Sequence, residues 1–323
     1  MSKTLIAISD TVFPDWKPAE AALSGMDFEL RQAATPDADA ILEVARDAEA
    51  MFVTYAKITS DLIGKLNKCK VIGRFGIGTD NIDLDAAARA GITVTYAPVY
   101  CLEEVSDHSM ALLLSLVRKI PFSTSMVSAG RWEMPAVVPI RRLRGRTLGL
   151  IGIGNIAQAV IRKAQAFGIE TIAADPYAPD SLFAAQKTER VDLDELYARS
   201  DFISVHAPLT PETEKMLNAE AFRKMKPEAL IINTSRGPLV DIDALAAALD
   251  AGEIAGAGLD VLPQEPPAAN NPLFGRDNVI LTPHIAYCAN EALEGRFQFF
   301  ADNCQKIIDG AVPNMAVNAD AVK

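Results

Sequence analysis

One segment near the middle of the chain constrains the fold more than any other. The apolar run Thr147–Ile151 reads as a strand, and it leads through Gly152-x-Gly154-x-x-Ala157 directly into a helical pattern. In a nucleotide-binding βαβ unit, the first glycine permits a tight turn, the second lets the backbone approach a pyrophosphate, and a small third residue lets helix and strand pack closely. The segment therefore predicts a parallel α/β sheet with a dinucleotide site. Packing alone is the alternative explanation for such a turn.

The residues after this turn indicate which dinucleotide is bound. The helix N-terminus faces the phosphates, so the amides of Asn155 and Ile156 are the expected donors. Asp175 lies 21 residues after Gly154, at the end of the next predicted strand, where a carboxylate accepts hydrogen bonds from ribose hydroxyls. It would repel a 2′-phosphate, and the PYAPD run that follows contains no Arg or Lys to neutralise one. The sequence thus predicts NAD as the cofactor.

The chain has 323 residues, which favours two domains over one. Short apolar runs alternate with helical patterns, as is typical of repeated βαβ units in parallel sheets covered on both faces. The predicted strands of the first block are Thr4–Ile8, Ala50–Thr54, Lys70–Phe75 and Ile92–Thr95. Those of the second block begin at Thr147 and continue with Ile169–Ala174, Phe202–Val205, Ala229–Asn233, Gly256–Asp260 and Val279–Leu281, which makes six strands.

Helical spacing of apolar residues predicts the elements between and after these strands. In the first block the predicted helices are Ala38–Arg46, Asp61–Leu66 and Leu84–Ala90, and Asn81 is expected to cap the helix that follows the RFGIGTDN turn. Glu103–Lys119 has no Gly or Pro and reads as a buried or interface helix that Pro121 stops. Asn290–Asp309 reads as an amphipathic helix closed by Gly310.

Charge and composition exclude several classes of function. The formal net charge of −11, from 42 acidic and 31 basic residues, argues against nucleic acid or an anionic membrane as a partner. We therefore interpret the arginine-rich stretch Arg141–Arg146 as a solvated connector. No apolar run approaches the roughly 18–20 residues that span a bilayer, and MSKTLIAISD lacks a signal-peptide core, so a cytoplasmic location is expected. The spacing of the cysteines and histidines predicts reduced thiols and no metal site.

Three ionisable residues follow predicted strands, where open α/β sheets place their chemistry. They are Arg236 in INTSRGPLVD, Glu265 in LDVLPQEPP and His284 in LTPHIAY. Each alone reads as a surface cation, a solvated carboxylate or a loop histidine. Together they supply what hydride transfer to a 2-oxo acid requires: a fixed cation for the carboxylate and carbonyl oxygen, an acid–base for the hydroxyl proton, and a carboxylate that holds this base.

The chain resembles the D-isomer-specific 2-hydroxyacid dehydrogenase family. The similarity rests on VIGRFGIGTDNIDL, LRGRTLGLIGIGNIAQAV, SDFISVHAPLTPETEKMLN, NTSRGPLVDIDAL, GLDVLPQEPP, TPHIAY and VPNMAVN, which stand in family order over nearly the whole length. The resemblance implies that Arg236, Glu265 and His284 are catalytic. It also implies cofactor contacts at Asn155, Ile156, Asp175, His206, Ala207, Pro208, Thr213, Thr234, Ser235 and Asp260, beside Gly152 and Gly154 of the turn.

Within the family, the sequence is similar to the C-terminal binding protein branch. PVYCLEEVSDH and Arg74 carry this similarity, with Tyr287 where that branch has a tryptophan and Tyr55 where it has a pocket tyrosine. Thr54 stands near the place of the substrate arginine of phosphoglycerate dehydrogenases, so an uncharged side group on the 2-oxo acid is expected. Packing alone is the alternative for both tyrosines. The resemblance further implies that the amides of Ile77 and Gly78 bind the substrate carboxylate.

These features predict two doubly wound parallel-sheet domains. Residues 1–98 and 290–323 are expected to form a smaller, flavodoxin-like substrate domain, and residues 99–289 a Rossmann NAD-binding domain. The expected function is the NAD-dependent interconversion of a 2-oxo acid and a D-2-hydroxy acid by hydride transfer. The alternative is an NAD-sensing, corepressor-like interaction protein with weak residual dehydrogenase activity. The apolar Glu103–Lys119 helix and the following arm Phe122–Pro135, with Trp132, predict a homodimer, although the helix could instead pack wholly within its own chain.

Overall fold

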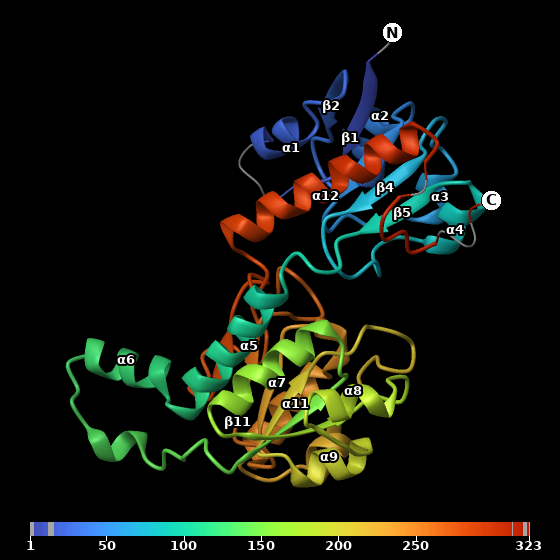
Figure 1. The fold of residues 1–323 in the computed structure, drawn as a ribbon. Coiled ribbons are helices and arrows are strands. Elements are labelled where there is room, and N and C mark those ends of the chain that lie inside the picture. The colour runs from blue at the N-terminus through green and yellow to red at the C-terminus, as the bar shows by residue number, and fades with distance from the viewer. Residues whose placement is uncertain (1–2, 12–15, 312, 319–321, 323) are drawn as a thin grey trace. The chain divides into compact units, whose positions relative to one another are not determined.

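The computed structural model describes residues 3–11, 16–311, 313–318 and 322. The chain divides into two compact units (Figure 1). Met1–Tyr100 and Ala289–Lys323 form one, here called the terminal unit because it contains both chain ends, and Cys101–Cys288 form the other, the central unit. Each unit is built on one parallel sheet.

The terminal unit has a five-stranded sheet in the order β2-β1-β3-β4-β5. Its strands are β1 (Thr4–Ile8), β2 (Phe28–Gln32), β3 (Ala50–Val53), β4 (Val71–Arg74) and β5 (Thr93–Tyr96), and every neighbouring pair is parallel. This is the flavodoxin-like order, so the predicted fold class is confirmed for this unit. Strand β2 was not predicted, because FELRQ is a largely exposed edge strand without a buried run.

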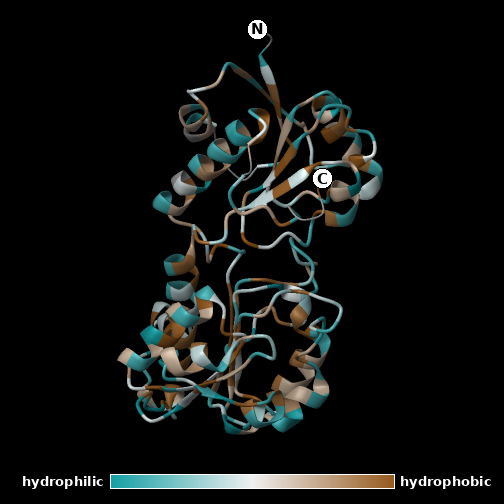
Figure 2. Ribbon diagram, turned by 45° about the vertical axis from the view of Figure 1, so that its right-hand side comes forward, coloured by the Kyte–Doolittle hydropathy of each residue, from teal (hydrophilic) through white to brown (hydrophobic). Residues whose placement is uncertain are grey.

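Helices cover both faces of this sheet, because successive strand residues point to opposite sides. Ala7 contributes to the core formed with α2 (Ala38–Ala45), α3 (Ser60–Ile63) and α4 (Leu84–Arg89). Ile6 and Ile8 contribute to the other core, formed with α1 (Lys17–Ala22) and α12 (Asn290–Ile308). In Figure 2 the strands of this unit are largely hydrophobic, whereas its helices alternate hydrophobic and hydrophilic residues.

The central unit has a seven-stranded sheet in the order β12-β11-β10-β9-β6-β7-β8, with all neighbours parallel. Its strands are β6 (Thr147–Ile151), β7 (Glu170–Ala174), β8 (Glu189–Arg190), β9 (Phe202–Val205), β10 (Leu230–Asn233), β11 (Gly256–Leu259) and β12 (Val279–Leu281). The first six in chain order are arranged as in the Rossmann fold, which confirms the predicted architecture. The expectation of six strands omitted β8, a two-residue exposed edge strand.

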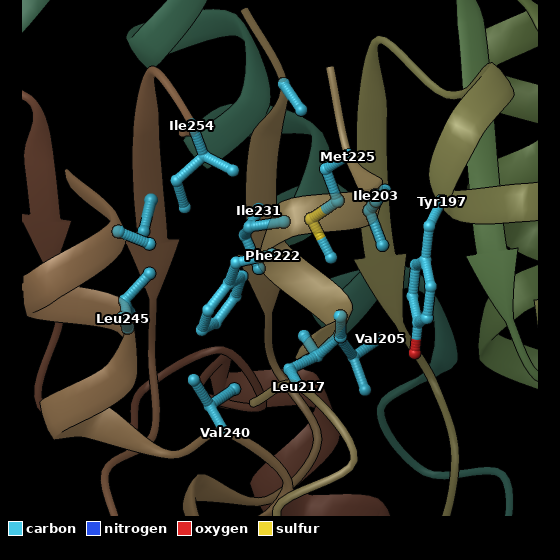
Figure 3. Packing of buried hydrophobic residues seen from close by; sticks show 14 of the residues in the cluster. Tyr197, Ile203, Val205, Leu217, Phe222, Met225, Ile231, Val240, Leu245 and Ile254 are labelled. Carbon is cyan, nitrogen blue, oxygen red and sulfur yellow. The ribbon is translucent and has the colours of Figure 1, made fainter. Parts of the chain in front are cut away.

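Two cores lie on the two faces of the central sheet. One contains Ile203, Val205 and Ile231, and Figure 3 shows it packed around Phe222 and Leu245. It is covered by α9 (Leu193–Arg199), α10 (Ala219–Lys224) and α11 (Ile242–Ala251). The other core lies under α5 (Leu102–Val117) and α7 (Asn155–Ala166). The remaining helices of the unit are α6 (Ile120–Ser128) and α8 (Asp180–Ala185), with 3₁₀ turns at Met134–Val137 and Gly237–Leu239.

The end of α5 differs from the expectation that Pro121 stops it. The helix ends at Val117, and the chain turns at Lys119, whose φ is 52°. Pro121 lies in the first turn of α6, where a missing amide costs no hydrogen bond. No single helix in the described part of the chain is long and apolar enough to cross a membrane. α5 and α6 pass that test only as a pair bent by 59°, by length and composition alone.

Candidate active site

The candidate site of the central unit lies along the carboxyl edge of its sheet. The strand order reverses between β6 and β9, and in parallel α/β sheets ligands bind in the crevice beside such a switch point. The glycine turn follows β6, His206 follows β9, Thr234 follows β10, Asp260 follows β11 and Thr282 follows β12. The predicted cofactor and catalytic residues therefore come from neighbouring loops.

The glycine turn has the geometry that a dinucleotide needs. Gly152 has a φ of +92°, and a Cβ there would lie 2.9 Å from the carbonyl oxygen of His206, so a larger residue would force the β6 and β9 loops apart. Gly154 is the N-cap of α7, and a Cβ on it would meet no heavy atom within 4 Å. Helix α7 begins at Asn155, directly after this open position. The open approach to a helix N-terminus fits a pyrophosphate.

Asp175 is held rigidly at the end of β7. One carboxylate oxygen accepts the amide of Ile153 at 3.1 Å, and the other accepts the amides of Tyr177 and Ala178. The structure also brings Arg190 of β8 to this corner, where its guanidinium donates to the carbonyl oxygen of Asp175 at 3.2 Å and to Asp180. Arg190 was not predicted at this corner, because it lies 15 residues after Asp175 in the chain and not in the run that directly follows it.

The loop after β9 carries four of the predicted cofactor contacts. Burial lowers the pKa of His206 from 6.5 to about 4, so its imidazole is neutral at physiological pH. Its Nε2 lies 2.8 Å from the Ser204 hydroxyl, and Ala207 follows it. The Thr213 hydroxyl donates to the carbonyl oxygen of Pro208 at 2.7 Å and accepts the amide of Thr210, which closes the loop on itself.

The loop after β10 positions Arg236. The Asn233 side chain accepts the amide of Ser235 at 2.9 Å and donates to the carbonyl oxygen of Arg236 at 2.8 Å. The Ser235 hydroxyl donates to the carbonyl oxygen of Val205, and the Thr234 hydroxyl lies 2.8 Å from that of Ser109 on α5. Every residue from 233 to 236 thus takes part in a hydrogen bond, and these bonds fix the backbone that carries the side chain of Arg236.

Glu265 and His284 form a direct pair. Nδ1 of His284 lies 2.6 Å from Oε2 of Glu265, whose other oxygen accepts the amide of Leu262 at 2.9 Å. Burial by itself would raise the pKa of Glu265, but the hydrogen bond and charge of His284, the Leu262 amide and the charge of Arg236 together hold that pKa below its ordinary value. Glu265 is therefore an ionised acceptor, and Nε2 is the His284 nitrogen that can exchange a proton with a substrate.

The backbone of His284 adopts a left-handed conformation, with a φ of 55°, which is uncommon for a residue other than glycine. Its amide donates to the carbonyl oxygen of Asp260 at 2.8 Å. The Asp260 carboxylate, buried with the rest of its residue, accepts the Thr282 hydroxyl at 2.6 Å and the amides of Ile285 and Ala286. Asp260 was expected as a cofactor contact, and here both of its oxygens hold the His284 loop.

The aromatic ring of Tyr287 lies edge-on to that of His284, with 6.0 Å between the ring centroids. Tyr287 thus belongs to the central unit, as do Arg236, Glu265 and His284.

Within the described ranges, no three His, Cys, Asp or Glu side chains are grouped so that they could hold a metal ion. His108, Ser109 and Thr282 were not predicted as site residues, since no local pattern distinguishes them.

The other predicted substrate residues belong to the carboxyl edge of the terminal sheet. Tyr55 follows β3, is 38% exposed, and donates its amide to the Asp10 carboxylate, which also accepts the amide of Thr54. Arg74 ends β4, and a Cβ on Gly76 would overlap its guanidinium.

The loop after β4 continues through Ile77 and Gly78 to Asn81. The expectation that Asn81 caps the next helix is wrong. Asp83 caps α4 through the amide of Ala86, whereas the Asn81 side chain donates to the carbonyl oxygen of Ala56 at 2.9 Å. Asn81 thus joins the loops after β3 and β4.

The chain is similar to known proteins over most of its length. Residues 110–286 match the family model described as D-isomer specific 2-hydroxyacid dehydrogenase, NAD binding domain. The D-3-phosphoglycerate dehydrogenase of Methanocaldococcus jannaschii is 41% identical over 280 residues, which are 86% of this chain and 53% of that protein. The chain thus spans only about half the length of this curated relative.

Two solved structures are similar over nearly their whole length. D-lactate dehydrogenase from Aquifex aeolicus, complexed with NAD and lactic acid, is 32% identical with a TM-score of 0.86, covering 94% of this chain and 95% of that one. The NADPH-dependent glyoxylate/hydroxypyruvate reductase from Sinorhizobium meliloti, in complex with NADP and malonate, is 30% identical with a TM-score of 0.88, covering 99% and 98%.

Proposed function

Since the chain belongs to the D-isomer-specific 2-hydroxyacid dehydrogenase family, we propose that it is an NAD-dependent oxidoreductase that interconverts a 2-oxo acid and a D-2-hydroxy acid. The observation that carries this proposal is the 2.6 Å contact between His284 and Glu265, close to the charge of Arg236 and on the same sheet edge as the glycine turn. An acid–base, its carboxylate partner and a fixed cation are what this reaction asks of a protein.

Each of the three catalytic residues has a separate role in the proposed reduction. NADH, when bound, supplies a hydride to the keto carbon. Arg236 binds the substrate carboxylate and polarises the carbonyl oxygen, which stabilises the negative charge that develops there. His284 donates a proton from Nε2 to that oxygen, and Glu265 stabilises the imidazolium through Nδ1. Oxidation reverses these steps, with His284 accepting the hydroxyl proton.

The cofactor proposal rests on the open space at Gly154, at the start of α7, and on the fixed carboxylate of Asp175. NAD is proposed over NADP because Asp175 would repel a 2′-phosphate. Arg190, a cation at this corner, is engaged by Asp180 and by the carbonyl oxygen of Asp175. The remaining proposed cofactor contacts are Asn155, Ile156, His206, Ala207, Pro208, Thr213, Thr234, Ser235 and Asp260.

For the substrate we propose a 2-oxo acid with an uncharged side group. Tyr55 and Tyr287 are proposed as contacts of that group, and Arg74 with the amides of Ile77 and Gly78 as contacts of the carboxylate. These assignments rest on the family resemblance and on the residue types. We further propose a cytoplasmic location, which rests on composition alone.

A homodimer is also proposed, on the expected arm Phe122–Pro135 and its neighbours but not on helix α5. Met110, Leu112 and Leu113 are buried in the core of their own unit, so most of the apolar face of α5 is covered by its own chain. The exposed apolar side chains lie on α6 and on the segment after it, which projects from the unit in Figure 1. They are Ile120, Val127, Trp132, Met134 and Val138.

A cavity of about 410 Å³ lies beside this projecting segment. Its walls include Leu116, Phe122, Phe202 and Ile280, and they also include the paired charges of Arg141 and Glu228. A largely apolar hollow next to exposed apolar side chains is the surface that a second copy of the chain would cover.

The test of the proposed activity is a panel of 2-oxo acids with side groups of different size and charge, assayed by the oxidation of NADH. We expect turnover with at least one uncharged member, and loss of most turnover in His284→Ala with NADH affinity retained. NADH binding without oxidation by any 2-oxo acid would contradict the proposal and favour the NAD-sensing alternative. A large loss of NADH affinity in His284→Ala would reassign the histidine.

A further inference from the structure

Two neighbouring polar residues on α5 reach two of the loops of the candidate site. Helix α5 packs against β10, β11 and β12. Nε2 of His108 lies 2.9 Å from the hydroxyl of Thr282 in the loop after β12. The hydroxyl of Ser109 lies 2.8 Å from that of Thr234 in the loop after β10. One turn of this helix thus touches both the His284 loop and the Arg236 loop.

The hydrogen-bond donors in the first contact can be assigned from proton count. The Thr282 hydroxyl donates its single proton to the Asp260 carboxylate at 2.6 Å, and that carboxylate also accepts two backbone amides. The Thr282 oxygen is then the acceptor toward His108, and the proton lies on Nε2 of that imidazole. Two consecutive hydrogen bonds therefore connect these side chains, from His108 to Thr282 and from Thr282 to Asp260.

Asp260 in turn binds the backbone around His284. Its carboxylate accepts the amides of Ile285 and Ala286, and its carbonyl oxygen accepts the amide of His284 itself. A left-handed backbone at a residue other than glycine persists only where its surroundings over-determine it. Three hydrogen bonds to Asp260 on consecutive residues supply that constraint. Since a buried carboxylate is costly without donors, the Thr282 hydroxyl stabilises the arrangement as well.

The contact between Ser109 and Thr234 holds the Arg236 loop in a similar way. The Ser109 hydroxyl donates to the carbonyl oxygen of Val105 at 2.8 Å, as hydroxyls in helices often do, so it accepts the hydroxyl proton of Thr234. Ser109 is buried. Thr234 precedes Ser235 and Arg236, and the guanidinium of Arg236 donates to the carbonyl oxygen of Ser235.

We propose that His108 and Ser109 are positioning residues that set the geometry of the His284 and Arg236 loops for the reaction. The proposal rests on the proposed function, in which those two loops carry the acid–base and the fixed cation. Neither residue acts on the reacting atoms. His108 acts on Asp260 through Thr282, and its Nε2 also lies 3.5 Å from Oδ1 of Asp260. Ser109 acts through Thr234.

The kinetic test compares His108→Ala with His108→Gln and with Asp107→Ala. Gln keeps an N–H donor at a similar reach, and Asp107 is a neighbouring surface residue whose pairing with Lys163 is shared by Glu103. We expect His108→Ala to slow turnover of the oxo acid by about 10-fold to 100-fold, with the KM for NADH nearly unchanged. His108→Gln should restore most of the loss, and Asp107→Ala should resemble the wild type.

A double variant tests whether His108 acts through Thr282. Thr282→Val removes the hydroxyl that joins them, so His108→Ala with Thr282→Val should be no slower than the slower single variant. Additive losses would overturn the proposed path, and an unchanged turnover rate in His108→Ala would overturn the proposal. Ser109→Ala should raise the KM for the oxo acid more than it lowers kcat, because it acts on the residue that binds the carboxylate.

A readout without turnover separates this proposal from the proposed function. The chain has three histidines, so the imidazole nitrogens of ¹⁵N-histidine-labelled protein give a simple NMR spectrum. His108→Ala should remove one set of signals and shift or broaden those of His284, while those of His206 stay in place. Unmoved His284 signals would overturn the positioning role whether or not the protein reduces any oxo acid, and moved signals without activity would leave it standing while the proposed function fails.

Discussion

At the scale of single residues, the ionisation state of Glu265 decides what the His284 pair can do. Burial opposes the charge on this carboxylate, and the contacts to His284, Leu262 and Arg236 outweigh it, so the pKa of Glu265 is lowered. Glu265 therefore stays charged as the pH falls below the ordinary range of a glutamate. Its negative charge therefore lies 2.6 Å from Nδ1 of His284, which holds the ring with Nε2 left for the substrate.

Replacing Glu265 with Gln should move the alkaline limb of the reduction profile to lower pH. The amide carries no negative charge beside Nδ1, so the proton donor of the proposed reduction loses the group that stabilises its charged form. The measurement is the turnover rate for oxo acid reduction as a function of pH, under conditions where chemistry limits the rate. Glu220→Gln, an exposed site on α10, is the control. An alkaline limb that stays in place in the Glu265 variant would show that the two side chains are not coupled.

Replacing Asp175 with Ala should narrow the preference for NADH over NADPH. The wild type is expected to use NADH much better, and removal of the carboxylate removes the repulsion of the 2′-phosphate, which we expect to improve the relative efficiency with NADPH by about tenfold. The ratio of kcat/KM values for the two cofactors measures this, with Asp194→Ala on α9 as a surface control. Equal efficiencies in the wild type would refute the role of Asp175.

At the scale of elements, the two sheets are held by close approach of helices to strands. In the terminal unit, α12 brings Phe297 and Phe300 against Phe52 and Phe75, with ring centroids 5.0 Å apart for Phe75 and Phe297. A Cβ on Gly73 of β4 would lie 1.6 Å from the ring of Phe300. Glycine at this position is therefore what allows α12 to lie on β4, and through it the last helix of the chain covers the first sheet.

Replacing Gly73 with Ala should destabilise the terminal unit. The added methyl group must displace the Phe300 ring inside a filled core, which costs about 1–3 kcal/mol. Gly64→Ala is the matched control, because a Cβ there meets only ordinary contacts, the nearest at 3.4 Å, on an exposed turn. Thermal unfolding should show a lower midpoint for the Gly73 variant alone. Equal midpoints for both variants would mean that α12 moves away without cost.

At the scale of the whole molecule, the projecting segment of the central unit exposes large apolar side chains. Trp132 is 88% exposed and Met134 is 69% exposed, next to a largely apolar cavity. Large apolar side chains with this exposure are typical of interfaces. Leu113 is 1% exposed inside its own unit, so a charge placed there would test folding and not assembly.

The proposed dimer predicts a specific effect of changing the exposed pair. Trp132→Ser combined with Met134→Ser should weaken self-association at least tenfold, because aromatic anchors contribute about 2 kcal/mol or more to an interface. Sedimentation over a range of micromolar concentrations measures this. Tyr177→Ser, at a residue 91% exposed elsewhere on the unit, is the control. A wild type that sediments as a monomer would refute the dimer.

The sequence by itself determined the fold class, the family and the chemical identity of the proposed site. Turn chemistry and the alternation of apolar residues depend on near neighbours in the chain. The sequence therefore predicts the strands, the helices and the glycine turn, and it places Arg236, Glu265 and His284 after predicted strands. The tertiary structure alone decided features that depend on strand order. It added the exposed edge strands β2 and β8, buried the face of α5, and brought His108 to Thr282, 174 residues away. No local pattern predicts such a contact, because the two residues approach each other only after the parallel strands have paired.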